Sequence, residues 1–270
     1  MVKKHTVRVL EILRRDGLFQ LAKSASTYAY NRYLFRPWIR LRVTLHTLKR
    51  RDGISRPFQP IMIDPDEIKF IFIGEFNQKI HIGSIKGGSW DKCRYPIQSN
   101  PVYQGLKQRF CENMEWSNTV YYKNAEENIR NHNSYLGYES ICEFEERLAY
   151  VDDLYENIRD SGYRTQEQLA DSDWDSNRHP LVTPAHRRTG EIGVNIARDG
   201  SILHNDGIHR LVIAKILDLP EVPVHIIVRH KTWQQIRDTI ASDTASRSLR
   251  DRYTNHPDIQ TVLFDETTNQ

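Results

Sequence analysis

The chain has 270 residues, of which 39% are hydrophobic and 27% charged, so it can bury a sizeable core and is neither disordered nor fibrous. No stretch approaches 18 uncharged apolar residues, so the sequence predicts no membrane-spanning helix. The three cysteines are widely spaced, which excludes a disulfide framework and a cysteine metal site. The first residues lack the continuous apolar core of a secretory signal, and we therefore expect a cytoplasmic protein.

Charge is divided unevenly along the chain. Residues 1–56 carry 14 Lys and Arg residues against three acidic ones, a net charge of +11, whereas the remainder carries −8. Basic and aromatic residues interleave along this basic helical N-terminal arm, and Pro37 divides it into two helices or kinks a single one. Such an arm could bind nucleic acid or an anionic membrane surface, which would place the protein peripherally at the membrane. It could equally pack on its own domain or on a second subunit.

A turn-rich break at residues 52–60 precedes the predicted globular domain. The segments predicted next are strand pieces at 61–68 and 70–73, a short strand at 81–85, a glycine loop at 86–91, and helices at 101–122 and 139–162. The second of these helices places its apolar residues at steps of three and four and ends at Ser161-Gly162. Asp171–Asp175 lacks the glycine and glutamate of a calcium loop, so residues 170–190 are interpreted as a surface connection.

The segment 190–230 has the clearest pattern in the sequence. A half-buried strand at 192–196 is followed by a tight turn at Asp199-Gly200, a returning strand at 202–203 and a helix that begins near position 208. The almost continuous apolar run 222–228 predicts a strand covered on both faces. We therefore predict an α+β fold with a mixed sheet and packed helices over residues 61–230. A C-terminal helix at 232–240 and a polar tail are predicted for residues 231–270.

The start of the helix near position 208 is the candidate functional site. His209 and Arg210 fall in its first turn, where free backbone N–H groups and the positive end of the helix dipole favour an anion. A phosphate there could accept hydrogen bonds from the backbone, from the forked Arg210 and from His209. Asp206 could cap the helix or hold a magnesium ion that bridges to the phosphates. The alternative for His209 and Arg210 is a polar pair satisfied within the protein.

The order of these features resembles the ParB/sulfiredoxin superfamily. The resemblance covers residues 61–230 and is sharpest at Asp206-Gly207-Ile208-His209-Arg210 and the Val-Pro-Val strand at 222–224; Asp64–Ile68 and Leu154–Ile158 with the following Ser-Gly-Tyr also match. Members bind nucleotide phosphates at this helix, and they include chromosome-partitioning CTPases, sulfinic-acid reductases and free-serine kinases.

Departures from the family pattern narrow what the resemblance implies. Ile208 stands where sulfiredoxins carry their cysteine, which excludes reductase chemistry. Partitioning proteins carry Glu-Arg-Arg at this motif and a following helix-turn-helix, whereas here His209-Arg210 is followed by a single helix. The kinase-like branch, with its Asp-Gly-x-His-Arg motif, is the nearest match, and in that branch a carboxylate activates the acceptor hydroxyl.

The resulting hypothesis is a nucleotide-binding protein that transfers a phosphoryl group from ATP or ADP to a small hydroxyl compound. Gly207 and Ile208 would let phosphate approach the backbone, His209 and Arg210 would hold the β- and γ-phosphates, and Asp206 would orient Mg²⁺. Glu191 is the candidate catalytic base, unless it is an ordinary surface glutamate. The alternatives are a ParB-like DNA-binding protein or nuclease that uses the basic arm, and a non-catalytic nucleotide sensor that docks on a membrane or partner.

Overall fold

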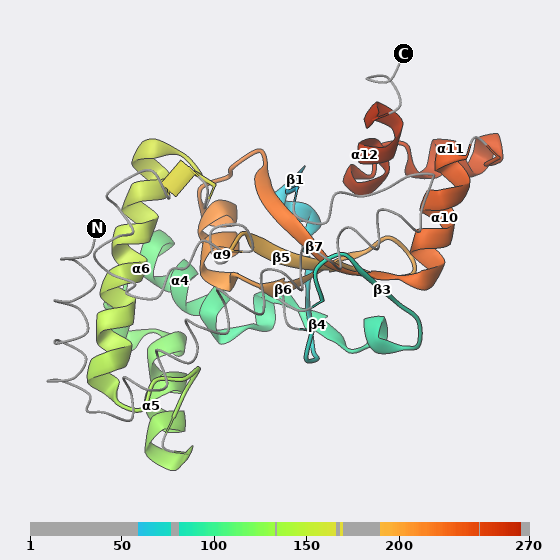
Figure 1. Ribbon diagram of the computed structural model, residues 1–270. Helices are drawn as coiled ribbons and strands as arrows, with labels where there is room; N and C mark the ends of the chain where they lie inside the picture. Colours follow the sequence, from blue (N-terminus) through green and yellow to red (C-terminus); the bar gives the residue numbers. More distant parts are fainter. Residues whose placement is uncertain are drawn as a thin grey trace, which may run out of the picture.

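The structure is a computed structural model that describes residues 59–76, 81–132, 134–165, 168–169, 190–242 and 244–265. Over these residues it contains seven β-strands in one mixed sheet and seven α-helices, which confirms the predicted α+β class (Figure 1). The basic arm at 1–56 and the carboxylates of Asp171–Asp175 lie outside the described residues.

The sheet is built around its longest strand. The strands are β1 (Ile61–Ile63), β2 (Phe70–Phe72), β3 (Ser84–Lys86), β4 (Arg94–Pro96), β5 (Ile192–Ile196), β6 (Ile202–Asp206) and β7 (Val222–His230). Their order is β1-β7-β5-β6-β2-β4, and β3 also pairs with β7. β5 and β6 form an antiparallel hairpin, whereas β5 runs parallel to β7 and β6 runs parallel to β2. Every residue of β7 is buried, as its apolar sequence predicted.

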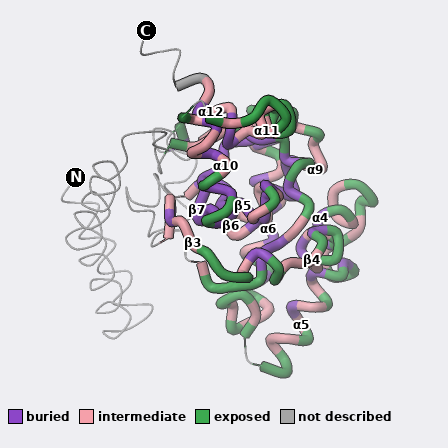
Figure 2. The backbone as a smooth tube through the Cα atoms, turned by 90° about the vertical axis from the view of Figure 1, so that its right-hand side faces the viewer, coloured by how far each residue is buried: buried purple, intermediate pink, exposed green. Residues whose placement is uncertain are grey.

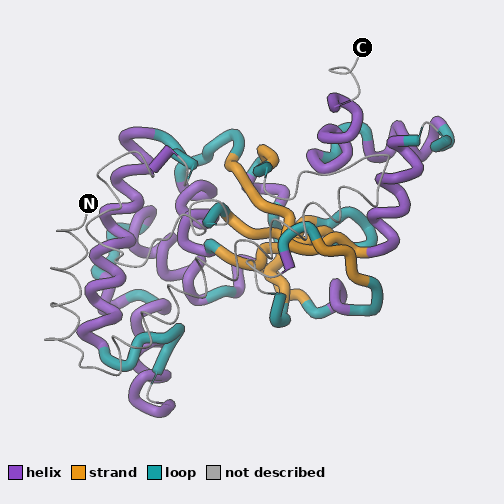
Figure 3. The backbone as a smooth tube through the Cα atoms, in the orientation of Figure 1, coloured by secondary structure: helices purple, strands orange, loops and turns teal. Residues whose placement is uncertain are grey.

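The helices gather into two groups on either side of the sheet (Figures 1 and 3). They are α4 (Pro101–Cys111), α5 (Val120–His132), α6 (Ile141–Ser161), α9 (Ile208–Ile216), α10 (Lys231–Ala241), α11 (Arg247–Tyr253) and α12 (Pro257–Asp265). The first group comprises α4, α5, α6 and α9, in which α9 contacts both α4 and α6. The second comprises α10 to α12, in which α10 contacts β7 and α12 contacts β1.

Helix ends follow local sequence signals in one predicted helix and depart from them in the other. Ser140 accepts a hydrogen bond from the Glu143 N–H at 3.2 Å and Gly162 follows with φ +74°, which confirms the helix predicted at 139–162. The single helix predicted at 101–122 was wrong, because α4 ends at Cys111 and Asn113 adopts φ +53°. The chain then restarts as α5, where Gln108 accepts a hydrogen bond from the Val120 N–H at 2.8 Å.

Helix α9 lies between two hydrophobic clusters. Leu211 and Ala214 pack into the cluster formed by the sheet with α10 and α12, whereas Val212 and Ile213 pack into the cluster of α4, α5 and α6. These four residues are fully buried, which explains why the apolar residues of this helix extend round more than one face. Figure 2 shows this buried region running through the sheet and α9. Helix α9 is therefore fixed by packing on both sides.

The segment after β7 belongs to the same folded unit. The helix predicted at 232–240 is confirmed as α10, and where a polar tail was predicted the chain forms α11 and α12. Trp233, Ile240 and Ile259 join the hydrophobic cluster of the sheet. None of the helices in the described part of the chain combines the length and the hydropathy needed to cross a membrane.

Candidate functional site

The turn between β6 and α9 depends on a glycine. Gly207 precedes the helix with φ +83°, a left-handed conformation that residues with a side chain adopt only at a cost. A Cβ atom there would lie 3.3 Å from the backbone of Ile192 and from the Arg210 guanidinium. The first N–H with an acceptor inside the helix is that of Leu211, which bonds the Gly207 carbonyl at 3.2 Å. The N–H groups of the three preceding residues are thus left for acceptors outside the helix.

Asp206 is exposed beside this turn. Its Oδ1 accepts the Gly207 N–H at 2.8 Å, and among the described residues no side chain caps the first turn of α9, so the capping interpretation is wrong. The described residues contain no group of three or more His, Cys, Asp or Glu side chains placed to hold a metal ion. Asp206 therefore fits Mg²⁺ only as a single protein ligand, with phosphate and water oxygens as the others.

Arg210 is held by the segment that enters β5. Its Nη1 donates to the Tyr163 hydroxyl at 3.2 Å and lies 3.5 Å from Oε2 of Glu191, and its Nη2 donates to the Gly190 carbonyl. The side chain of Glu191 is only 4% exposed, so its interpretation as a surface glutamate is wrong. In this arrangement Glu191 neutralises and orients Arg210.

His209 bridges two residues from distant parts of the sequence. Its Nε2 lies 3.0 Å from the Tyr121 hydroxyl and its Nδ1 lies 3.4 Å from Nη2 of Arg147. An arginine can only donate, so Nδ1 is the acceptor and, in the neutral ring, Nε2–H donates to Tyr121. Burial and the charge of Arg147 lower the pKa of His209 to about 3, which keeps the ring neutral at pH 7. Both ring nitrogens are thus used inside the protein.

Arg147 brings a second guanidinium group to this turn. It projects from α6, and its charge lies 4.7 Å from the centre of the Tyr150 ring. Within the part of the chain that the structure describes, Arg147 forms no ion pair with a carboxylate. It is only half-buried, so a ligand that approaches the start of α9 from solvent could reach it.

His204 lies in β6 just before the turn and is 4% exposed. Neither of its ring nitrogens has a hydrogen-bond partner among the described residues. Burial lowers its pKa to about 4, more than the neighbouring Asp206 backbone raises it, and the charge of Arg210 lowers it further. The β6–α9 junction therefore collects Arg147, His204 and Arg210 close to the neutral ring of His209, and of the two guanidinium groups Arg210 pairs with the buried carboxylate of Glu191.

The structure brings most of the predicted site residues together. Glu191, Gly207, His209 and Arg210 meet at the junction, Asp206 lies exposed at its edge, and Ile208 packs against both hydrophobic clusters. Sequence reasoning missed Tyr121, Arg147, Tyr163 and His204. For Arg147 a signal was present, because it lies on the apolar side of α6, three residues after the buried Phe144. A basic residue in such a position needs a partner.

Comparison of the chain with models of known protein families, with curated proteins and with solved structures finds no match. The resemblance to the ParB/sulfiredoxin superfamily therefore stays a prediction, based on the motif at the β6–α9 turn and the order of the elements.

Proposed function

We propose that the first turn of α9 binds the phosphate groups of a nucleotide such as ATP or ADP. The observation that carries this proposal is the excess of basic groups at the turn. Arg147 and Arg210 supply two guanidinium groups, and Glu191 pairs with only the second of them. A guanidinium forms strong paired hydrogen bonds with phosphate, and the free N–H groups of a helix start add further donors.

Each basic residue has a distinct role in the proposal. Arg147 is the principal side-chain ligand, because it is half-buried and has no ion pair among the described residues. His209 is a positioning residue, since its Nδ1 accepts from Arg147 and its Nε2–H is tied to Tyr121. Arg210 is neutralised by Glu191, and its role in the proposal is to hold the turn in place through its hydrogen bonds to the Tyr163 hydroxyl and the Gly190 carbonyl.

Transfer of a phosphoryl group to a small hydroxyl compound is the further step of the proposal, supported by the Asp-Gly-x-His-Arg motif. Asp206 would offer one carboxylate oxygen to Mg²⁺, which when bound neutralises phosphate charge. Glu191 is less suited to be the catalytic base than the sequence indicated, because it would have to leave Arg210 before it could accept a proton.

Isothermal titration calorimetry with ADP and ATP, with and without Mg²⁺, tests the binding step. We expect Arg147→Gln to weaken nucleotide binding at least about tenfold, since a hydrogen bond to a charged group is worth about 1.5–3 kcal/mol. Arg130→Gln on α5 is the matched control, because Arg130 is exposed and its one ion pair within the described residues is with Glu126, four residues away. Equal affinity of the two variants, or no binding by the wild-type chain, would contradict the proposal.

A variant that removes Arg210 must also remove the negative charge of Glu191. Arg210→Ala alone would leave Glu191 buried without its cation, so loss of binding could reflect a local rearrangement. The double variant Arg210→Gln/Glu191→Gln keeps the junction neutral and should still lose affinity for nucleotide. His209→Ala should lose affinity as well, because it releases Arg147 from its orientation.

A further inference from the structure

The ring of His204 has hydrogen-bonding capacity that the described part of the protein does not use. The residue is 4% exposed, and neither ring nitrogen forms a hydrogen bond with any described residue. A buried polar group without a hydrogen bond costs free energy of folding, so most such groups in proteins have a partner. The position of this ring therefore decides what could use its nitrogens.

The register of the sheet places His204 under α9. His204 pairs with Ile71 of β2 and with Val194 of β5. Side chains at paired positions lie on the same face of a sheet, and Ile71 and Val194 both belong to the cluster that contains Leu211 of α9. The ring is therefore on the face of the sheet that α9 covers, and its neighbours in the adjacent strands are apolar.

The ring also lies close to the first turn of this helix. It interacts electrostatically with Arg210 and with His209, the two basic residues of that turn. Arg210 donates to the Tyr163 hydroxyl and the Gly190 carbonyl, and both ring nitrogens of His209 are used inside the protein. His204 differs from both, because neither of its nitrogens has a partner among the described residues.

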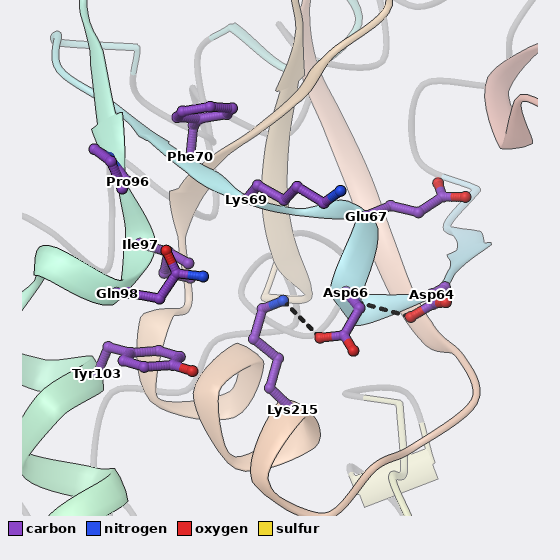
Figure 4. A pocket seen from close by; sticks show the side chains of 10 residues that line it. All are labelled: Asp64, Asp66, Glu67, Lys69, Phe70, Pro96, Ile97, Gln98, Tyr103 and Lys215. Atoms are coloured by element: carbon purple, nitrogen blue, oxygen red, sulfur yellow. Dashed lines mark hydrogen bonds and ion pairs between the residues drawn. The ribbon is translucent and has the colours of Figure 1, made fainter.

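The buried basic group at the opposite end of α9 does have a partner. Lys215, in the last turn of the helix, borders an open groove of about 730 Å³, and its side chain is 9% exposed. Figure 4 shows it extending toward Asp66, with which its Nζ forms an ion pair at 3.0 Å. Within the described residues a partner is thus provided at the far end of α9, whereas His204 at the near end has none.

We propose that His204 is a phosphate-binding residue, and that one of its ring nitrogens donates a hydrogen bond to the phosphate held at the first turn of α9. This inference rests on the proposed function and adds a buried donor from β6 to those of Arg147 and the helix start. A neutral histidine carries one N–H, so the bond requires no change of protonation. The free energy lost by burying the ring is recovered when the phosphate binds.

Replacement of His204 by leucine separates this role from a structural one. His204→Leu has a similar size and removes two nitrogens without partners, so its urea unfolding midpoint without ligand should be equal to or higher than that of the wild type. In calorimetric titration of the full chain with ADP at neutral pH, the Kd of the variant should be at least about tenfold higher. A lower midpoint, or an unchanged Kd, would overturn the proposal.

His256 provides the matched control, because both of its ring nitrogens have partners. Its Nδ1 accepts the Asp258 N–H at 3.1 Å, and its Nε2 donates to the Gly200 carbonyl at 2.9 Å. His256→Leu should therefore lower the unfolding midpoint and leave the Kd for ADP unchanged. The two leucine variants should thus have opposite effects on stability and on binding.

Two amide variants identify the nitrogen that donates. The amide nitrogen of His204→Gln can take the place of Nε2, and that of His204→Asn the place of Nδ1. One of the two variants should bind ADP within about threefold of the wild type, and loss of affinity in both would contradict the proposal. If the wild type binds no ADP, the proposed function fails together with this inference. If Arg147→Gln weakens binding and His204→Leu does not, only this inference fails.

Discussion

The carboxylates of Asp258 and Glu191 are both buried, and the basic groups around them are arranged differently. Asp258 accepts hydrogen bonds from Arg229 at 2.6 Å and Trp233 at 2.8 Å, and Arg237 lies 3.5 Å away. The charged groups of this cluster are almost completely shielded from solvent. Glu191 pairs with Arg210, while the neighbouring Arg147 has no ion pair in the described part of the chain.

This difference separates a structural cluster from a candidate binding site. Around Asp258 the donors surround one carboxylate and connect α12 to β7 and α10, so the interactions stabilise the fold. At the β6–α9 junction the half-buried guanidinium of Arg147 contacts His209 in the first turn of α9 and has no ion pair in the described part of the chain. In our proposal this is the arrangement that binds an anion.

The largest expected effect is on stability and comes from the Asp258 cluster. Asp258→Asn keeps the shape of the side chain but removes the carboxylate charge that pairs with the buried Arg229 and Arg237. We expect the free energy of unfolding to fall by about 3–5 kcal/mol, measured by urea denaturation. Asp160→Asn, which removes an exposed carboxylate from α6, should cause no measurable change. A comparable loss in both variants would remove the distinction between the two clusters.

A second prediction concerns how the free energy of unfolding depends on pH, through His204 at the β6–α9 junction. The pKa of His204 is about 4 in the folded protein, against about 6.5 for an unperturbed histidine, so the unfolded chain binds more protons between these values. The contribution of His204 to stability is complete above pH 6.5 and is lost as the pH falls toward 4. We expect the free energy of unfolding to fall by about 1–2 kcal/mol between pH 7 and pH 5 from this cause.

Urea denaturation across this pH range measures the effect of His204. His204→Gln should show a correspondingly flatter pH dependence, whereas His132→Gln, at the exposed end of α5, should follow the wild type. If His204→Gln retains the full slope, burial of this ring does not control the pH response of the junction.

A further effect of similar size is expected from the turn itself. Gly207→Ala places a side chain at φ +83° with its Cβ 3.3 Å from the Ile192 backbone, and we expect a loss of about 1–2 kcal/mol. Gly87→Ala is the matched control, because this glycine has no positive φ and the nearest atom to its Cβ would be 3.9 Å away. Similar unfolding midpoints for the two variants would show that the turn tolerates a side chain.

Local features of the fold were predictable from local sequence. The ends of α6 follow from Ser140 and Gly162, and the burial of β7 follows from its continuous apolar residues. The break between α4 and α5 was missed because it depends on Asn113 in a left-handed conformation and on a contact between Gln108 and the start of α5. Propensity along the chain carries little information about either.

The candidate site was predictable only in the part that is continuous in sequence. The turn residues 206–210 share one motif, whereas Tyr121 and Arg147 reach His209 across 88 and 62 residues of chain. The role of Glu191 likewise depends on the pairing of β5 with β6, which brings it beside Arg210. Long-range contacts of this kind depend on tertiary packing, which no local pattern specifies.

The contribution of α10 and α12 to the central core determines where the chain can be shortened. A truncation after His230 would remove Trp233, Ile240 and Ile259 from the cluster that packs on the sheet. It would also leave Arg229 buried without Asp258, its partner 29 residues later. Recombinant fragments intended for ligand-binding work should therefore retain α12. The motif at the β6–α9 turn ends at residue 210 and β7 ends at residue 230, so α12 lies well beyond both.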